Sequence, residues 1–319
     1  MPNRTSQLSP ARPAAAGSRP SRAGLLGGSA PILTSAVLWG TTGTAGSLAP
    51  AGAPAAAIGC AGLALGGILL FLTSRGARSL PARCTGRERW LLVLGALAVA
   101  GYPVTFYPAV ARTGVAVATV IALGSAPVFA GLLSWLCGQA RPTARWTTAT
   151  AAAVLGCTLL VLGPELTGQA TPTDLTGVVL AVCGGLSYAV HALIGGRLIT
   201  HGHPSGAVMG VLFGAAGLLV LPLVLLAGPH WLATARGAAV AVYLALFTVC
   251  LAYRLFGHGL RRTPASLATS LTLAEPAVAA VLGVTVLGER LPAASWTGLA
   301  VLALGLVLLA LPRSRSRQR

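Results

Sequence analysis

The sequence predicts an all-α integral membrane protein of ten transmembrane helices, arranged as two inverted five-helix repeats with both termini cytoplasmic. Three observations lead to this prediction: an apolar composition, ten apolar runs of spanning length, and a sequence repeat between the two halves. Of the 319 residues, 55% are hydrophobic and only 8% are charged, whereas soluble domains carry about 25% charged residues. We therefore expect a multi-pass protein of the cytoplasmic (inner) membrane, with the lipid bilayer as its surroundings.

Each apolar run is close to the length that crosses the hydrocarbon core of a bilayer. In chain order the runs cover 30–48, 54–73, 90–111, 115–136, 146–162, 175–196, 206–227, 238–257, 266–287 and 296–311. The predicted organisation is a disordered cytoplasmic tail (1–28), a first five-helix repeat (29–163), a second five-helix repeat (170–312) and a basic cytoplasmic tail (313–319).

The formal charge of +17 comes from 22 basic residues, all of them arginine. Most of these lie in the termini and in alternate loops, which is the pattern of positive-inside topology and not of a nucleic-acid-binding groove. With the N-terminus inside, only Arg112, Arg236 and Arg290 of the loop arginines lie outside, together with the loop that carries Glu165 and Asp174. The arginine distribution therefore predicts that both termini are cytoplasmic.

Two segments that lie 150 residues apart, 138–147 and 288–297, match at five of ten positions. Each half of the chain has an odd number of spans, so the second copy must enter the membrane from the opposite face. Such inverted repeats are typical of secondary transporters. The same offset aligns Glu275 with Ser125 and brings Pro276 within one position of Pro127, which predicts a helix kink in each repeat.

Glu275 lies in the middle of the ninth apolar run, directly before Pro276. An ionised side chain at membrane depth costs about 3 kcal/mol unless it faces protein or water, so such a residue indicates a functional site. The proline cannot donate an amide and is expected to leave backbone carbonyls free for a polar cavity. We weigh substrate or proton binding by Glu275 against a purely structural hydrogen bond, and favour binding.

Arg254, on the preceding span, has two possible roles. Its long side chain could pair with Glu275 across a cavity, or it could extend to the cytoplasmic interface. In the first case Glu275 stays ionised. In the second, Glu275 becomes a candidate proton carrier.

Other polar or aromatic side chains at membrane depth complete the predicted substrate or coupling site. They are Trp39, Thr42, Tyr107, Ser125, Tyr188, His191, Tyr253 and Thr272, with Thr41, Thr44, Tyr102 and Ser187 at similar depths. Trp39 and Tyr188 are related by an offset of 149, and each fits a cavity wall as well as a core or interface position. His191 fits either a titrating group or a hydrogen-bonded core residue.

These features resemble the EamA-type branch of the drug/metabolite transporter (DMT) superfamily, over residues 30–312. The resemblance is carried by Leu38-Trp39-Gly40-Thr41-Thr42-Gly43-Thr44, the Pro127 helix, and Glu275-Pro276 followed by Leu287-Gly288-Glu289-Arg290-Leu291. It implies efflux or uptake of small metabolites, such as amino acids, through a central cavity between the first four helices of each repeat. The fifth and tenth helices would then be outer supports. One departure is Gly138-Gln139-Ala140-Arg141, where many relatives have Gly-Glu-Arg.

We therefore expect a secondary transporter that exports a small amino acid-like or drug-like solute by alternating access. Protons are a possible second partner, and a homodimer a possible assembly. The alternatives are a channel-like facilitator or a multi-span membrane enzyme. Enzyme signatures are missing: the only aspartate is Asp174, in a loop, and neither HExxH nor GxSxG occurs. The sequence contains no lysine for a Schiff-base cofactor and no CxxC pair, so no cofactor, metal site or nucleic-acid partner is predicted.

Overall fold

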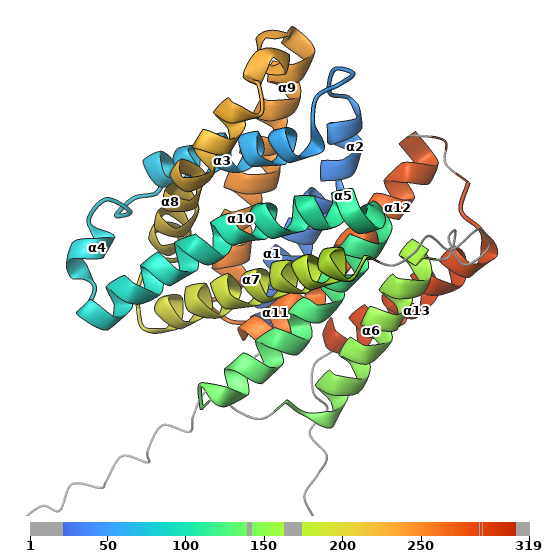
Figure 1. The fold of residues 1–319 in the computed structure, drawn as a ribbon. Helices are drawn as coiled ribbons and strands as arrows, with labels where there is room; N and C mark the ends of the chain where they lie inside the picture. The colour runs from blue at the N-terminus through green and yellow to red at the C-terminus, as the bar shows by residue number, and fades with distance from the viewer. Residues whose placement is uncertain (1–21, 139–141, 163–173, 287, 289, 311–319) are drawn as a thin grey trace, which may run out of the picture.

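The computed structural model describes residues 22–138, 142–162, 174–286, 288 and 290–310, which form helices and loops with no strand among them (Figure 1). The helices are α1 (Arg22–Gly40), α2 (Thr42–Ser47), α3 (Ala55–Thr73), α4 (Leu80–Arg83), α5 (Gly86–Leu136), α6 (Ala144–Leu162), α7 (Leu175–Thr200), α8 (Ser205–Leu226), η2 (Pro229–Ala233), α9 (Ala235–Tyr243), η3 (Leu244–Leu251), α10 (Ala252–Gly259), α11 (Ala265–Leu271), α12 (Ala274–Val286) and α13 (Ala293–Ala310).

Within these ranges, nine stretches are long and apolar enough to cross a bilayer, and they correspond to the second through tenth predicted spans. They are Ala55–Thr73, Gly86–Val115, Val117–Leu136, Ala144–Leu162, Leu175–Thr200, Ser205–Leu226, Ala235–Gly259, Ala265–Val286 and Ala293–Ala310. The predicted all-α membrane fold is confirmed.

The first predicted span, 30–48, is divided between α1 and α2. The two helices meet at Thr41, whose hydroxyl donates to the carbonyl of Leu38 at 2.6 Å and accepts from the hydroxyl of Tyr243 at 2.8 Å. α1 begins at Arg22, earlier than the tail boundary expected at residue 28, while the rest of the tail, 1–21, lies outside the described residues.

The third and fourth spans form one element, α5, in which the chain turns at Gly114 (Figure 1). Gly114 has φ 82° and ψ 160°, a backbone conformation that is readily available only to glycine. The turn allows two spans to follow each other with almost no loop. The helical backbone continues through Pro127, which is buried in the second half of α5.

The eighth span widens in its middle: η3, between α9 and α10, is a π-helix of eight residues. π-Helical turns are rare and occur often at functional sites. Carbonyl groups of this region accept side-chain hydrogen bonds from α1. Ser35 Oγ donates to Ala252 at 2.8 Å, and Trp39 Nε1 donates to Thr248 at 2.8 Å.

The fifth and tenth spans, α6 and α13, pack against each other at one edge of the bundle (Figure 1). Their contact uses small residues, because a Cβ atom on Gly156 would collide with the backbone of Leu302, and one on Gly298 with that of Leu160. Such close approach is typical of helix pairs in membranes. Elsewhere α5 packs along α7, and α3 along α8.

Arg112, just before the turn in α5, contacts Asp174, which precedes α7, and both residues are expected on the same side of the membrane. Arg112 Nη1 lies 3.0 Å from Asp174 Oδ2, and Asp174 Oδ1 also accepts the N–H of Thr176 at the start of α7. The Arg112 hydrogen bond is the main reason why the pKa of Asp174 lies below its ordinary value. This contact joins the middle of the first repeat to the start of the second.

Candidate substrate site

Glu275 lies in the first turn of α12, directly after a break in the ninth span. α11 ends at Leu271 and α12 begins at Ala274. The Glu275 N–H donates to the carbonyl of Thr272 at 3.0 Å, and this is the carbonyl that Pro276 would have bonded in a continuous helix. The span is thus interrupted before the proline instead of kinked at it. Pro276 lies in the first turn of α12, where backbone N–H groups have no intrahelical hydrogen-bond partner. The N–H that proline lacks is therefore lost there at little cost.

The carboxylate of Glu275 is half-buried. It makes no hydrogen bond or ion pair with any residue in the described part of the chain. Its place in the first turn of α12 puts it at the positive end of the helix dipole, which favours a negative charge there. This combination leaves an acceptor group available to a ligand.

Three tyrosines from both halves of the chain lie within electrostatic range of this carboxylate: Tyr102 of α5, Tyr188 of α7 and Tyr253 of α10. The hydroxyl of Tyr188 donates to Thr272 Oγ1 at 3.0 Å, and Thr272 Oγ1 donates in turn to the carbonyl of Thr269. Glu275, Thr272 and these three tyrosines are called the Glu275 site below.

Trp39, at the end of α1, packs against this site. Its ring centroid lies 4.8 Å from that of Tyr253 and 6.4 Å from that of Tyr188, and its indole N–H is bonded to η3. Gly40 follows it, and a Cβ there would collide with Val278 and with the carbonyl of Glu275. The small residue at this position therefore lets α1 reach the N-terminus of α12.

His191 lies one turn beyond Tyr188 on α7, with ring centroids 5.1 Å apart. The ring is 2% exposed and also contacts Phe213, Tyr253 and Phe256. Neither ring nitrogen has a hydrogen bond of good geometry with a described residue, although the carbonyl of Ser187, one turn earlier, interacts with the ring. His191 is therefore a core residue behind the tyrosines, and not one that faces Glu275 directly.

Four other predicted site residues lie elsewhere. Arg254 is exposed, and its Nη2 donates to Thr73 Oγ1 at 2.6 Å, at the end of α3. Of the two roles considered for Arg254, the structure therefore does not show the pairing with Glu275. Tyr107 lies against Gly59 of α3, Ser125 bonds the carbonyl of Ala122 and faces Gly185 of α7, and Thr42 begins α2.

Two features of the site are not apparent in the sequence. In the sequence, nothing distinguishes Tyr102 from the other polar residues at membrane depth. Tyr102 belongs to the Glu275 site only because of the way the first half of α5 packs against α7. The π-helix that accepts the Trp39 hydrogen bond has no local signature, since the run Leu244–Leu251 is uniformly apolar apart from Thr248. Packing of distant helices decides both.

Comparison with known proteins identifies the family. A model described as the EamA-like transporter family matches residues 26–162 and again residues 175–311. The chain belongs to the EamA-like transporter family. This transporter is therefore a multi-pass membrane protein built from two EamA repeats, in the drug/metabolite transporter superfamily, and the predicted transport class is confirmed over the membrane-enzyme alternative.

Individual relatives agree with this assignment. The transporter is 39% identical over 286 residues to the uncharacterized transporter YwfM of Bacillus subtilis (strain 168), an alignment that covers 89% of this chain and 94% of the relative. It is 36% identical over 163 residues to the threonine/homoserine exporter RhtA of Escherichia coli (strain K12), covering 50% of each chain. One solved crystal structure, 19% identical, superimposes with a TM-score of 0.72 over 88% of this chain and 95% of the other, which supports the fold.

The structure describes only part of the two loop segments, 138–141 and 287–291, that were compared with the family pattern. Leu287 and Glu289 lie outside the described residues, as do Gln139, Ala140 and Arg141 of the first repeat. Arg290 and Gly288 are described, and Gly288 has φ 70° in the loop after α12.

Proposed function

We propose that this transporter exports amino acid-like solutes across the cytoplasmic membrane by alternating access, and that the Glu275 site binds the solute. The observation that carries the proposal is a half-buried carboxylate without a partner among the described residues, in a helix break at membrane depth. The arginine distribution supports cytoplasmic positions for both termini, which is part of the proposal.

The chemistry of the Glu275 site suits an α-amino acid. The ammonium group of such a solute pairs with the carboxylate of Glu275, and the surrounding aromatic rings attract a cation through their π faces. The N-terminus of α12, the positive end of the helix dipole, favours the carboxylate group of the solute, as half-helix N-termini do in other transporters. One acidic group in the site matches one ammonium group, and a more highly charged cation would lack a second counter-charge.

The printed name of the relative RhtA, a threonine/homoserine exporter, supports the same solute class and an outward direction. That relative aligns with only half of the present chain, so the extension to this transporter is part of the proposal. Alternating access is supported by the two repeats and by the origin of the site: Tyr102 comes from the first repeat, and Tyr188, Tyr253 and Glu275 come from the second. Movement of one repeat against the other would change the surroundings of Glu275.

The test is counterflow and efflux in proteoliposomes loaded with labelled threonine or homoserine, with wild-type protein, Glu275→Gln and a control carboxylate variant, Asp174→Asn. We expect saturable flux in the wild type and in the control, and at least a tenfold loss in Glu275→Gln. A 2-hydroxy acid of the same size, which lacks the ammonium group, should compete poorly. Equal flux by wild type and Glu275→Gln would overturn the role of Glu275.

The same preparation separates the remaining alternatives. An imposed pH gradient that drives flux in the wild type but not in Glu275→Gln would assign protons as the coupled ion. Flux that does not saturate and shows no counterflow would assign a channel-like facilitator instead. The molar mass of the detergent-solubilised protein tests the homodimer.

A further inference from the structure

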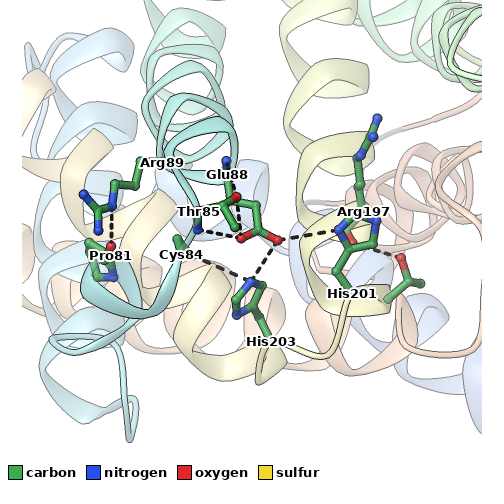
Figure 2. A network of polar contacts seen from close by, with 9 residues as sticks. Pro81, Cys84, Thr85, Glu88, Arg89, Arg197, His201 and His203 are labelled. Carbon is green, nitrogen blue, oxygen red and sulfur yellow. Dashed lines mark hydrogen bonds and ion pairs between the residues drawn. The ribbon is translucent and has the colours of Figure 1, made fainter.

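A group of metal-binding side chains lies outside the Glu275 site, where the N-terminus of α5 meets the loop between α7 and α8 (Figure 2). It consists of the Cys84 sulfur, the Glu88 carboxylate and the His203 imidazole, whose ligand atoms all lie within 4.8 Å of one another. Cys84 Sγ lies 3.9 Å from His203 Nε2, and this nitrogen lies 3.3 Å from Glu88 Oε1.

These separations are close to those of ligands that already share a metal ion. Zinc bonds of about 2.0 to 2.3 Å in tetrahedral geometry place neighbouring ligand atoms about 3.3 to 3.8 Å apart. Two of the three separations in the cluster, 3.3 and 3.9 Å, differ little from this range, and the third is at most 4.8 Å. Small side-chain rotations would therefore complete the coordination.

A hydrogen-bonded contact without metal explains the arrangement less well. His203 Nε2 faces both the sulfur of Cys84 and the carboxylate of Glu88, and a single ring nitrogen can donate only one proton. A cation between the three atoms would satisfy all of them. The cluster is also shielded from water, because Cys84 is 4% exposed and the side chains of Glu88 and His203 are 15% and 16% exposed.

Glu88 is held in place by the start of α5. It forms a capping box with Thr85: its Oε2 accepts the Thr85 N–H at 2.9 Å and the Thr85 hydroxyl at 3.0 Å, while Thr85 Oγ1 accepts the Glu88 N–H. The other carboxylate oxygen, Oε1, is left facing the histidines. Figure 2 shows Arg89 turned toward Pro81, whose carbonyl it bonds at 2.8 Å.

His203 is held in place by the end of α7. Gly202 has φ 99°, its N–H donates to the carbonyl of Ile199, and the His203 N–H donates to the carbonyl of Leu198, which together form a Schellman motif. His201, the last residue before this turn, places Nδ1 3.6 Å from Glu88 Oε1 and is half exposed. It lies in the position of an outer partner that orients the Glu88 carboxylate.

We propose that Cys84, Glu88 and His203 bind a Zn²⁺ ion, with a water molecule in the fourth position and His201 as a positioning residue for Glu88. Sulfur, imidazole and carboxylate are the ligands that zinc uses in proteins, and three protein ligands with one open position make an exchangeable site. The thiolate and the carboxylate together balance the charge of the ion. Because Cys84 and His203 lie 119 residues apart, the sequence contains no metal-ligand spacing that would indicate this site.

The location of the site has a structural consequence. Cys84 and Glu88 belong to the first EamA repeat and His203 to the second. A bound ion would therefore cross-link the two repeats at the end of the bundle that the arginine distribution places in the cytoplasm, where thiols are kept reduced.

The test uses Co²⁺ as a spectroscopic substitute for Zn²⁺. The full chain, free of any histidine tag and stripped of metal with a chelator, is titrated with Co²⁺ in detergent under reducing conditions. We expect one Co²⁺ per chain, with visible bands of tetrahedral cobalt and a near-ultraviolet thiolate-to-cobalt band, all displaced by Zn²⁺. Absence of the thiolate band in folded wild-type protein at saturating Co²⁺ would overturn the proposal without reference to any variant.

Variants assign the ligands. Cys84→Ser should abolish the thiolate band. His201→Ala, which removes the outer partner, should weaken Zn²⁺ binding by roughly 10- to 100-fold. His203→Ala, which removes a ligand, should weaken it by more. Matched controls are Cys137→Ser and His258→Ala, which replace an exposed cysteine and an exposed histidine and should leave binding unchanged. Circular dichroism and gel filtration establish that each variant is folded. A thiolate band that persists in Cys84→Ser, or unchanged affinity in His203→Ala, would show that the cluster does not bind the metal.

Discussion

The hydroxyl of Tyr188 donates a hydrogen bond to Thr272 Oγ1 at 3.0 Å, which ties α7 to the helix break that carries Glu275. Tyr188 is 6% exposed and Thr272 is 2% exposed, so the bond lies in the interior of the bundle. Both residues belong to the second repeat, but Tyr188 also contacts Trp39 and Tyr102 of the first. A change at the Glu275 site can therefore be transmitted to the contact between the repeats.

Replacement of Tyr188 by Phe tests this relationship. The variant keeps the ring and loses one buried hydrogen bond, worth about 1 kcal/mol, or roughly fivefold in an equilibrium constant. We expect a KM for the exported solute that is raised by about this factor, measured by efflux from proteoliposomes.

The control is Tyr243→Phe, which removes a partly buried tyrosine–threonine bond to Thr41 outside the Glu275 site. Both variants should lower the thermal stability, and only Tyr188→Phe should change KM. Identical transport kinetics in the two variants would show that the Tyr188 bond is purely structural.

Trp39→Phe tests the contact between α1 and the π-helix. The variant leaves the Thr248 carbonyl without its buried donor, which should cost about 1 to 3 kcal/mol in unfolding free energy. Thermal unfolding in detergent measures this, with Trp296→Phe as the control because Trp296 is 50% exposed. Equal melting temperatures for the two variants would argue against a stabilising role for the Trp39 N–H.

The pair Arg112–Asp174 should make stability depend on pH. Because the Arg112 hydrogen bond lowers the pKa of folded Asp174, the pair stabilises the fold above the unfolded pKa of about 4, and this contribution is lost as the pH falls through the lowered folded pKa. The difference in melting temperature between wild type and Asp174→Asn should therefore be present at neutral pH and disappear as the pH falls below the lowered pKa of folded Asp174. Added salt should reduce the difference at neutral pH, because both side chains are partly exposed. A difference that stays constant with pH and salt would show that the charge of Asp174 is not the source of the effect.

Much of the candidate site could be predicted from local sequence. Glu275 is conspicuous because a carboxylate in an apolar run is costly in lipid, and Thr272, Tyr188 and Tyr253 were predicted with it and lie around it. Arg254 could not be assigned in this way, because its long side chain could reach either Glu275 or the cytoplasmic interface. Only the packing of α10 against its neighbours directs it to Thr73. Pro276 was predicted to kink a helix, whereas the chain ends α11 before it and uses the proline to begin α12.

The spans and their repetition are encoded in the amino-acid sequence alone, because lipid leaves a backbone few ways to satisfy its polar groups other than a helix of spanning length. The break at Thr272, the π-helix that accepts Trp39 from 209 residues away, and the cluster of Cys84 with His203 arise only in the folded chain. Each depends on which helix faces lie against one another. Many small packing contacts between distant segments determine which faces meet. These contacts cannot be predicted from any local sequence pattern.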